Sequence, residues 1–304
     1  MIGKALLHLL LLFLLSPLLL GVIGKTKALF AGRWGAPLLQ PYFDLWKLAR
    51  KEMVLSETTT WVFLAGPLIG FAVPPLAALF IPFGALPAPV SFNGDLILFV
   101  YLFGLSRFFT ASAALDTGSS FEGMGAAREV TFSCLAEPTL LFVLIVLARL
   151  ADDLSLGAML GPTLHLSWHQ AGAALGLALV SLFVVLLVEN SRIPFDDPNT
   201  HLELTMIHEV MVLDHSGPAF GLILYGAAMK LFVLGAVLVR MALPMTYSSA
   251  WLNLAIFVAG MLALAVVIGV VESIMARLRL IRVPQVLVGT TLLSAFAMVL
   301  LLRQ

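Results

Sequence analysis

The stretch AGAALGLALVSLFVVLLVENSRIPFDDPNTHLELTMIHE, residues 171–209, changes from apolar to acidic at Glu189. Residues 171–188 carry no charge and are long enough to cross a bilayer as a helix, and a second such run begins at residue 219. The segment between the two runs is either a solvated loop or a structured acidic element at one face of a membrane protein. Against a single cation, Arg192, this segment holds Glu189, Asp196, Asp197, Glu203, Glu209 and Asp214.

The composition of the whole chain is that of a membrane protein. Hydrophobic residues make up 61% of its 304 residues and charged residues 11%, whereas charged residues make up about a quarter of ordinary soluble domains. Basic and acidic residues are equal in number, 17 of each. No basic excess therefore points to nucleic acid as a partner.

Eight apolar runs of about 20 residues each predict eight transmembrane helices. The runs cover residues 5–23, 61–83, 96–115, 130–150, 171–188, 219–241, 251–271 and 283–302. The expected fold is an all-α polytopic membrane protein, with one integral membrane domain over residues 1–304 and structured loops. Residues 5–23 are not interpreted as a signal peptide, because no small-residue cleavage site follows them. Helices are expected to kink or break at Pro67, Pro74, Pro75 and Pro138.

The distribution of lysine and arginine predicts the orientation. Most of them fall in the loops that follow the odd-numbered runs, and the opposite side holds only Lys4, Arg149, Arg240 and Arg303. Because cytoplasmic loops are the ones enriched in lysine and arginine, residues 24–60, 116–129 and 189–218 are expected to form cytoplasmic loops. Both termini are then expected outside.

Two of the predicted cytoplasmic loops have features of their own. Residues 33–52, RWGAPLLQPYFDLWKLARKE, place Leu45 and Leu48 on one helical face and Lys47 and Arg50 on another, which is typical of an amphipathic helix at a membrane surface. Residues 116–129, DTGSSFEGMGAARE, contain three glycines. Glycines there allow another backbone to approach closely.

Together with the central segment, these loops resemble the membrane subunit that docks the peripheral arm in respiratory complex I and in group 4 membrane-bound [NiFe] hydrogenases. The resemblance covers nearly the whole chain and implies eight membrane helices, outward termini and the cytoplasmic membrane of a prokaryote. Its carriers are QPYFD at residues 40–44 with Lys47 and Leu48, GAARE at 125–129, RIPFD at 192–196, and Ser216 with Gly217.

One departure distinguishes the two branches of this family. Quinone-reducing members usually follow the Pro-Phe-Asp element with closely spaced glutamates, whereas Asn199 and His201 stand there in this chain and only Glu203 remains. This favours a membrane-anchor and coupling subunit of a formate hydrogenlyase-like complex. The alternatives are a quinone-binding subunit of a complex I-like NADH dehydrogenase and a stand-alone secondary transporter, although no internal repeat supports the latter.

The resemblance also implies partners and docking residues. The partners are the [NiFe] hydrogenase large subunit, the iron–sulfur small subunit, antiporter-like membrane subunits and the lipid bilayer. No cofactor is expected in this chain, because its one cysteine, Cys134, cannot hold an iron–sulfur cluster; the NiFe centre and the clusters are expected in the partners. The electron donor and the translocated ion, proton or sodium, stay open. The implied docking residues are Arg33, Gln40, Asp44, Lys47, Glu122, Arg128, Glu129, Arg192 and Phe195.

Two charges lie inside predicted spans, where insertion of each costs about 2.5–3.5 kcal/mol. Glu137 lies two turns into its run and Lys230 lies near the middle of another. The two residues either pair and neutralise each other or belong to a proton relay, which the resemblance favours. The expected relay runs from Asp196, Asp197, Glu203 and Glu209 through Glu189 to Glu137, with Lys230 as the cationic partner.

Other polar residues carry weaker signals. Four further charges fall nearer the ends of their runs, where snorkelling or solvation of the charged group accounts for them. They are Arg107, Asp116, Glu189 and Glu272. His201 and His208 match no metal motif such as His-Glu-x-x-His. The sequence contains no nucleotide-binding or hydrolase motif, so the chain is expected to have no active site of its own.

Overall fold

The computed structural model describes residues 2–196, 206–243 and 247–303, and within these ranges it contains helices and no strands. Eight helices are long and apolar enough to cross a membrane, so the predicted all-α polytopic fold is confirmed. They are α1 (Ile2–Phe30), α3 (Trp61–Ala78), α4 (Asp95–Asp116), α5 (Ser120–Ala151), α7 (Leu164–Glu189), α8 (Gly217–Ala242), α9 (Ala250–Ile274) and α10 (Val283–Leu302). The shorter elements are α2 (Gln40–Ala49), α6 (Leu156–Met159) and the 3-10 turns η1 (Glu209–Val212) and η2 (Leu280–Arg282).

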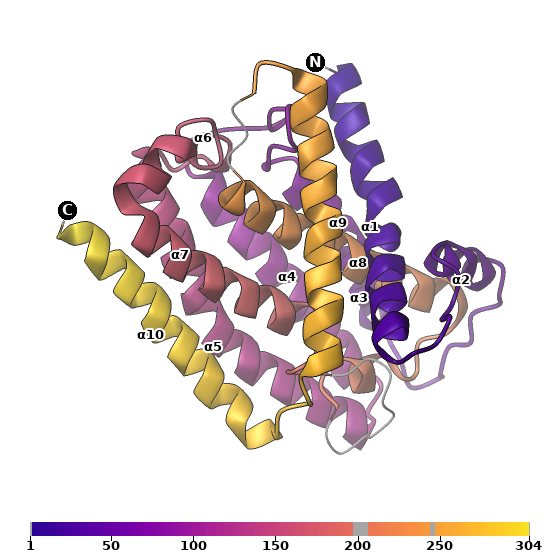
Figure 1. Cartoon of the computed structure of the whole chain (residues 1–304). Helices are drawn as coiled ribbons and strands as arrows, with labels where there is room; N and C mark the ends of the chain where they lie inside the picture. Colours follow the sequence, from indigo (N-terminus) through magenta and orange to yellow (C-terminus); the bar gives the residue numbers. More distant parts are fainter. Residues whose placement is uncertain (1, 197–205, 244–246, 304) are drawn as a thin grey trace.

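Successive long helices run in alternating directions through one bundle (Figure 1). Helix α3 packs against α4 and α8, α1 packs against α8 and α9, and α5 packs against α7 and α10. Both chain ends lie toward one side of the bundle, here called the terminal face (Figure 1). The described parts of the connection from α7 to α8, residues 190–196 and 206–216, lie on the opposite side, the loop face, and α2 lies beside α1 and α8.

One predicted loop is largely helical. Of residues 116–129, only the first few form a turn, because α5 begins at Ser120 and continues to Ala151. The turn contains Gly118 with a φ of 72°, a conformation that favours glycine. Ala126 and Glu129 are buried, so the first part of α5 is stabilised by contacts with other parts of the protein.

The prolines of the spans do not end their helices. Both α3 and α5 continue through all four of the prolines at which a kink or break is expected. Helix α1 contains Pro17, whose missing N–H leaves the carbonyl of Phe13 without its usual partner. The hydroxyl of Tyr225 in α8 donates to that carbonyl at 2.9 Å. A neighbouring helix thus replaces the lost hydrogen bond, as the interior of a membrane requires.

Glycines bring α3 close to both of its neighbours. A Cβ at Gly226 of α8 would lie 2.6 Å from the carbonyl oxygen of Gly70 in α3. A Cβ at Gly66 of α3 would lie 2.7 Å from Cβ of Ala113 in α4. Small residues at such crossings allow close helix packing in membranes, and these crossings fix the relative positions of α3, α4 and α8, three of the helices that line the cavity described below.

Candidate functional site

Asp196 binds the acidic segment to other parts of the protein through hydrogen bonds and an ion pair. Its side chain is 1% exposed. Oδ2 accepts hydrogen bonds from the backbone N–H groups of Ile207 at 3.2 Å and His208 at 3.0 Å, and Oδ1 lies 3.0 Å from Nη2 of Arg277. Burial alone would raise the pKa of Asp196, but the hydrogen bonds and charge of His208, together with Arg277, lower it. At Asp196 the segment is therefore structured, and the solvated-loop alternative is wrong there.

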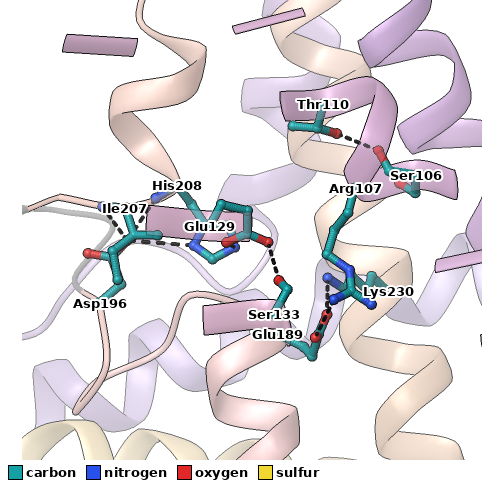
Figure 2. Close-up of polar contacts among 10 residues, drawn as sticks. All are labelled: Ser106, Arg107, Thr110, Glu129, Ser133, Glu189, Asp196, Ile207, His208 and Lys230. Atoms are coloured by element: carbon teal, nitrogen blue, oxygen red, sulfur yellow. Dashed lines mark hydrogen bonds and ion pairs between the residues drawn. The ribbon is translucent and has the colours of Figure 1, made fainter. Parts of the chain in front are cut away.

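His208 lies between two carboxylates (Figure 2). Its Nε2 lies 2.9 Å from Oε2 of Glu129 in α5, and its Nδ1 lies 3.7 Å from Oδ2 of Asp196. Burial alone would lower the pKa of His208, but the charge of Glu129 and the contacts with both carboxylates raise it from 6.5 to about 10. The imidazole is therefore protonated at neutral pH and binds the acidic segment to α5.

A second group of charges lies deeper in the bundle (Figure 2). Nζ of Lys230 in α8 lies 2.7 Å from Oε2 of Glu189, the last residue of α7. Nη1 of Arg107 in α4 lies 3.6 Å from Oε1 of the same carboxylate, and Nη2 lies 2.9 Å from Oε1 of Glu137 in α5. Glu137 and Lys230 are therefore not each other's partner. The direct pairing that the sequence left open does not occur. Instead, Glu137 pairs with Arg107 and Lys230 pairs with Glu189, and Arg107 also contacts Glu189.

Arg107 also corrects an expectation. Its position near the middle of α4 and its side-chain exposure of 11% exclude the predicted solvation at a helix end. A buried guanidinium needs counter-charges, and Glu189 and Glu137 provide them. Glu189, too, is buried and not solvated at the end of its helix.

Glu129 connects the two groups. Its Oε1 accepts a hydrogen bond from Ser133 at 3.2 Å, one turn further along α5, and its charge interacts with those of Lys230 and Arg107. Charged side chains thus form a series from the acidic segment to the middle of the bundle, joined by contacts within each group and by the charge of Glu129 between the groups. In order, the series consists of Asp196, His208, Glu129, Lys230 with Glu189, and Arg107 with Glu137.

A cavity of about 400 Å³ lies beside this series, between α1, α3, α4 and α8. Its lining combines charged groups of the series with apolar side chains such as Phe103, Phe220 and Ile223. Glu272 of α9 also lines it and lies 2.8 Å from Nζ of Lys27 and 3.4 Å from Nη1 of Arg192. Because Glu272 is buried between these cations, the expectation that it is solvated is wrong.

The predicted docking residues differ in exposure. On residues 24–60, the first loop that the sequence predicts to be cytoplasmic, Arg33, Asp44 and Lys47 are exposed and Gln40 is half-buried. The amide of Gln40 donates to Oδ1 of Asp44 at 2.8 Å, one turn along α2. The side chains of this loop are therefore free to meet a partner. In contrast, Glu122, Glu129 and Phe195 are buried, so the prediction that they contact a partner directly is wrong.

Several of these residues instead hold the segment 206–216 against α5. Oε1 of Glu122 accepts a hydrogen bond from the backbone N–H of Asp214 at 3.1 Å, and Nη1 of Arg128 donates to the carbonyl of Met206 at 2.8 Å. A Cβ at Gly125 would lie 3.0 Å from the carbonyl oxygen of Ile207. The close backbone approach expected of the glycine-rich stretch therefore occurs at Gly125.

The series of charges does not continue to the terminal face. Between Glu137 or Lys230 and the terminal ends of their helices, residues 138–148 and 231–239 contain no Asp, Glu, Lys or Arg. The same holds for residues 9–22, 61–83, 96–106, 171–188, 251–271 and 284–302 of the other spans. Within the group formed by Glu189, Lys230, Arg107 and Glu137, only Glu137 reaches the side of the bundle. Its side chain is 41% exposed.

Sequence reasoning identified both ends of the series but missed His208 and Arg107. Arg107 could have been found, because a charge near the centre of a 20-residue apolar run is as costly as Glu137. His208 had no such signal, since its distance along the chain from Glu129 says nothing about contact. The expected relay contains three further acids. Glu209 lines the cavity, whereas Asp197 and Glu203 lie outside the described residues.

Carboxylates, an imidazolium and an ammonium within a few ångströms of one another can hold and transfer protons. Within residues 2–196, 206–243 and 247–303, no three His, Cys, Asp or Glu side chains form a candidate metal site. Cys134 is a free thiol, exposed on α5.

Comparison with known proteins agrees with this arrangement. A family model described as NADH dehydrogenase matches residues 3–303. The chain is 33% identical to formate hydrogenlyase subunit 4 of Escherichia coli K12 over 289 residues, 91% of each chain. It is 32% identical to hydrogenase-4 component C of the same organism over 77% of this chain and 72% of that one. Its fold is similar to a chain of the membrane-bound sulfane sulfur reductase, an archaeal respiratory membrane complex, with a TM-score of 0.83, 20% identity and 98% coverage of both chains.

Proposed function

The chain belongs to the NADH dehydrogenase family (subunit 1 type), and on that premise we propose that it is the membrane-anchor and coupling subunit of a group 4 [NiFe] hydrogenase complex of the formate hydrogenlyase type. The proposal rests on one observation above all. Charged side chains lead from the acidic segment to the middle of the membrane in a chain that is 33% identical to formate hydrogenlyase subunit 4 over 91% of its length. A passive anchor would not need these buried charges, because each is costly to insert.

In this proposal the loop face docks the soluble arm, namely the [NiFe] large subunit and the iron–sulfur small subunit, which hold the metal centres. Arg33, Asp44 and Lys47 contact the arm, since they are exposed. Arg128 and Glu122 act indirectly, because they position residues 206–216. The bias of lysine and arginine supports a loop face in the cytoplasm and termini outside the cytoplasmic membrane.

Coupling starts at the acidic segment. Delivery of an electron to a nearby cluster of the partner changes the local charge, which shifts the proton affinity of carboxylates within about 10 Å. Protons then move from the segment, whose acids include Asp197, Glu203 and Glu209, through Asp196 and His208 to Glu129. From Glu129 they pass to the group formed by Glu189, Lys230, Arg107 and Glu137.

The proposed exit is lateral. Between this group and the terminal ends of α5 and α8, residues 138–148 and 231–239 carry no charge, and Glu137 is the one member of the group that reaches the side of the bundle. We therefore place an antiporter-like membrane subunit against α5 at Glu137. Such a neighbour would also relieve the cost of a carboxylate exposed to hydrocarbon.

Purification of the tagged chain from its own membranes tests the proposal. The expected result is co-purification of a NiFe large subunit and an iron–sulfur small subunit in equal amounts, with hydrogenase activity. A chain that is stable, active in transport and free of both subunits would overturn the proposal in favour of a secondary transporter.

The cavity favours a second candidate function. A space of about 400 Å³ with apolar walls and charged groups at its side suits a ligand with an apolar body and a polar head, as a quinone-binding subunit of a complex I-like enzyme requires. Extraction of the purified complex with organic solvent distinguishes the two candidates. Stoichiometric quinone together with quinone reduction would favour this second candidate over the hydrogenase.

A further inference from the structure

A second cavity lies on the outside of the bundle, between α2 and the two membrane helices α1 and α8. It measures about 430 Å³. We call it the α2 groove, and its lining includes Pro17 of α1, Tyr42, Trp46 and Ala49 of α2, and Gly221 and Tyr225 of α8. It does not share these residues with the cavity beside the charge network.

Both tyrosine hydroxyls of the α2 groove are already hydrogen-bonded. The hydroxyl of Tyr225 donates to the carbonyl of Phe13, which Pro17 leaves without a helical partner. The hydroxyl of Tyr42 donates to the carbonyl of Leu14, in the next position along α1. Both hydroxyls are therefore bound to α1, and the groove offers an occupant mainly hydrocarbon. An occupant that needs hydrogen bonds along its length would not fit.

The α2 groove lies at the level of the membrane. Tyr42 reaches Leu14, near the middle of the 29-residue helix α1, so this part of α2 lies at the level of the hydrocarbon core. Helix α2 has no buried residues, and Trp46 is 62% exposed. Tryptophan is enriched where the hydrocarbon core meets the headgroups, which indicates that this end of the groove lies at the membrane–water interface.

Cations stand at that same end. The guanidinium of Arg50 lies 4.4 Å from the ring centroid of Trp46, and both Arg50 and Lys51 are exposed. A cation held over an aromatic ring of the groove provides a binding position for a phosphate. The α2 groove is thus apolar along its length and positively charged at one end.

We propose that the α2 groove binds one acyl chain of an anionic phospholipid, with its phosphate against Arg50. The lipid fills the space between α2 and the bundle and so holds α2, with its exposed Asp44 and Lys47, at a fixed height relative to the loop face. This proposal is independent of the hydrogenase assignment, because it requires only a membrane that contains anionic lipid.

The test uses the complex purified from its own membranes in mild detergent, with bound phospholipid counted by native mass spectrometry. Ala49→Trp fills the groove from an exposed position of α2 and should remove about one phospholipid per chain. Val54→Trp, which introduces the same side chain at a position that is 73% exposed and outside the groove, should leave the count unchanged. Equal counts in these two variants would overturn the proposal.

A second measurement tests the headgroup. The complex is reconstituted in nanodiscs of phosphatidylglycerol and phosphatidylcholine, and retention of each lipid is compared after detergent extraction. The complex should retain phosphatidylglycerol several-fold more than phosphatidylcholine, and Arg50→Gln should abolish the preference. An unchanged preference in this variant, or an isoprenoid quinone found in the groove instead of a phospholipid, would refute the proposal.

Discussion

Nζ of Lys230 lies 2.7 Å from Oε2 of Glu189, at the residue where the membrane helix α7 ends and the acidic segment begins. A single carboxylate therefore belongs to both the segment and the buried charge network. Because Arg107 contacts the same carboxylate, a change of charge at Glu189 is felt by two cations on two other helices. Such a shared group is what a coupling element needs.

Replacement of Glu137 by Gln should separate chemistry from ion movement. The variant keeps the size of the side chain, and Arg107 keeps Glu189 as a counter-charge, so the complex should assemble. Hydrogen turnover in detergent should largely survive, whereas ion translocation in sealed vesicles should fail. Glu57→Gln, on an exposed loop, is the matched control. Full translocation in the Glu137 variant would leave this carboxylate only a structural partner of Arg107.

The ion pair of His208 predicts a loss of stability at alkaline pH. Its pKa is about 10 in the folded protein, against the ordinary histidine value of 6.5 that applies to the unfolded chain. A pKa raised by folding contributes stability that is complete below the unfolded value and disappears as pH rises through the folded value. The unfolding temperature should therefore fall between pH 6.5 and 10, and His208→Gln should flatten that part of the profile. A profile identical to that of the exposed control His169→Gln would contradict this role.

Two glycines on the same helix should respond oppositely to alanine. A Cβ at Gly125 would lie 2.4 Å from Cγ1 of Val210 and 3.0 Å from the carbonyl oxygen of Ile207, and such overpacking typically costs about 1–3 kcal/mol. At Gly123 the nearest outside atom is Cδ2 of Leu115 at 3.9 Å, so alanine should be neutral or stabilise by up to about 1 kcal/mol. Thermal unfolding measures the difference, and equal effects would mean that the segment moves freely away from α5.

The loop face can be tested at Asp44 and Arg128. Asp44→Ala removes an exposed charge, and Arg128→Ala removes the hydrogen bond to Met206, which is worth about 1.5–3 kcal/mol when one partner is charged. Both variants should lose hydrogenase subunits during purification, and Arg128→Ala should also lower the unfolding temperature of the isolated chain. Wild-type subunit stoichiometry and hydrogenase rate in both variants would rule out the docking role.

The fold could be predicted from the sequence because hydrophobic length alone specifies a membrane helix. The eight runs were located without any knowledge of contacts, and the boundaries differ mainly where the helix continues into a polar stretch, as α5 does before Val130. That extension was missed because Gly123 and Gly125 argue for a loop. Contacts with the segment 206–216 outweigh their low helix propensity.

The pairing within the charge network could not be predicted in the same way. Which faces of α4, α5, α7 and α8 turn toward one another depends on the rotation of each helix, and spacing along one helix says nothing about rotation between helices. Glu137 and Lys230 were recognised because charges in apolar runs are rare. Of their actual partners, Arg107 is discounted by a rule about span ends that ignores where each side chain points. Glu189 is expected in the relay, but not as the partner of Lys230.

In the terminal half of the bundle, the charged side chains of the described residues, such as Asp95 and Arg240, lie near the helix ends, and this distribution has an electrical consequence. Moving one elementary charge across a membrane potential of 100 mV takes about 2.3 kcal/mol of work, and the voltage falls mainly across the part of the membrane that lacks polar and charged groups. A proton that arrives at Glu137 from the loop face has therefore crossed little of the voltage. Nearly all of the electrical work falls on the step after Glu137, so a voltage applied across sealed vesicles should slow the neighbouring subunit far more than this chain.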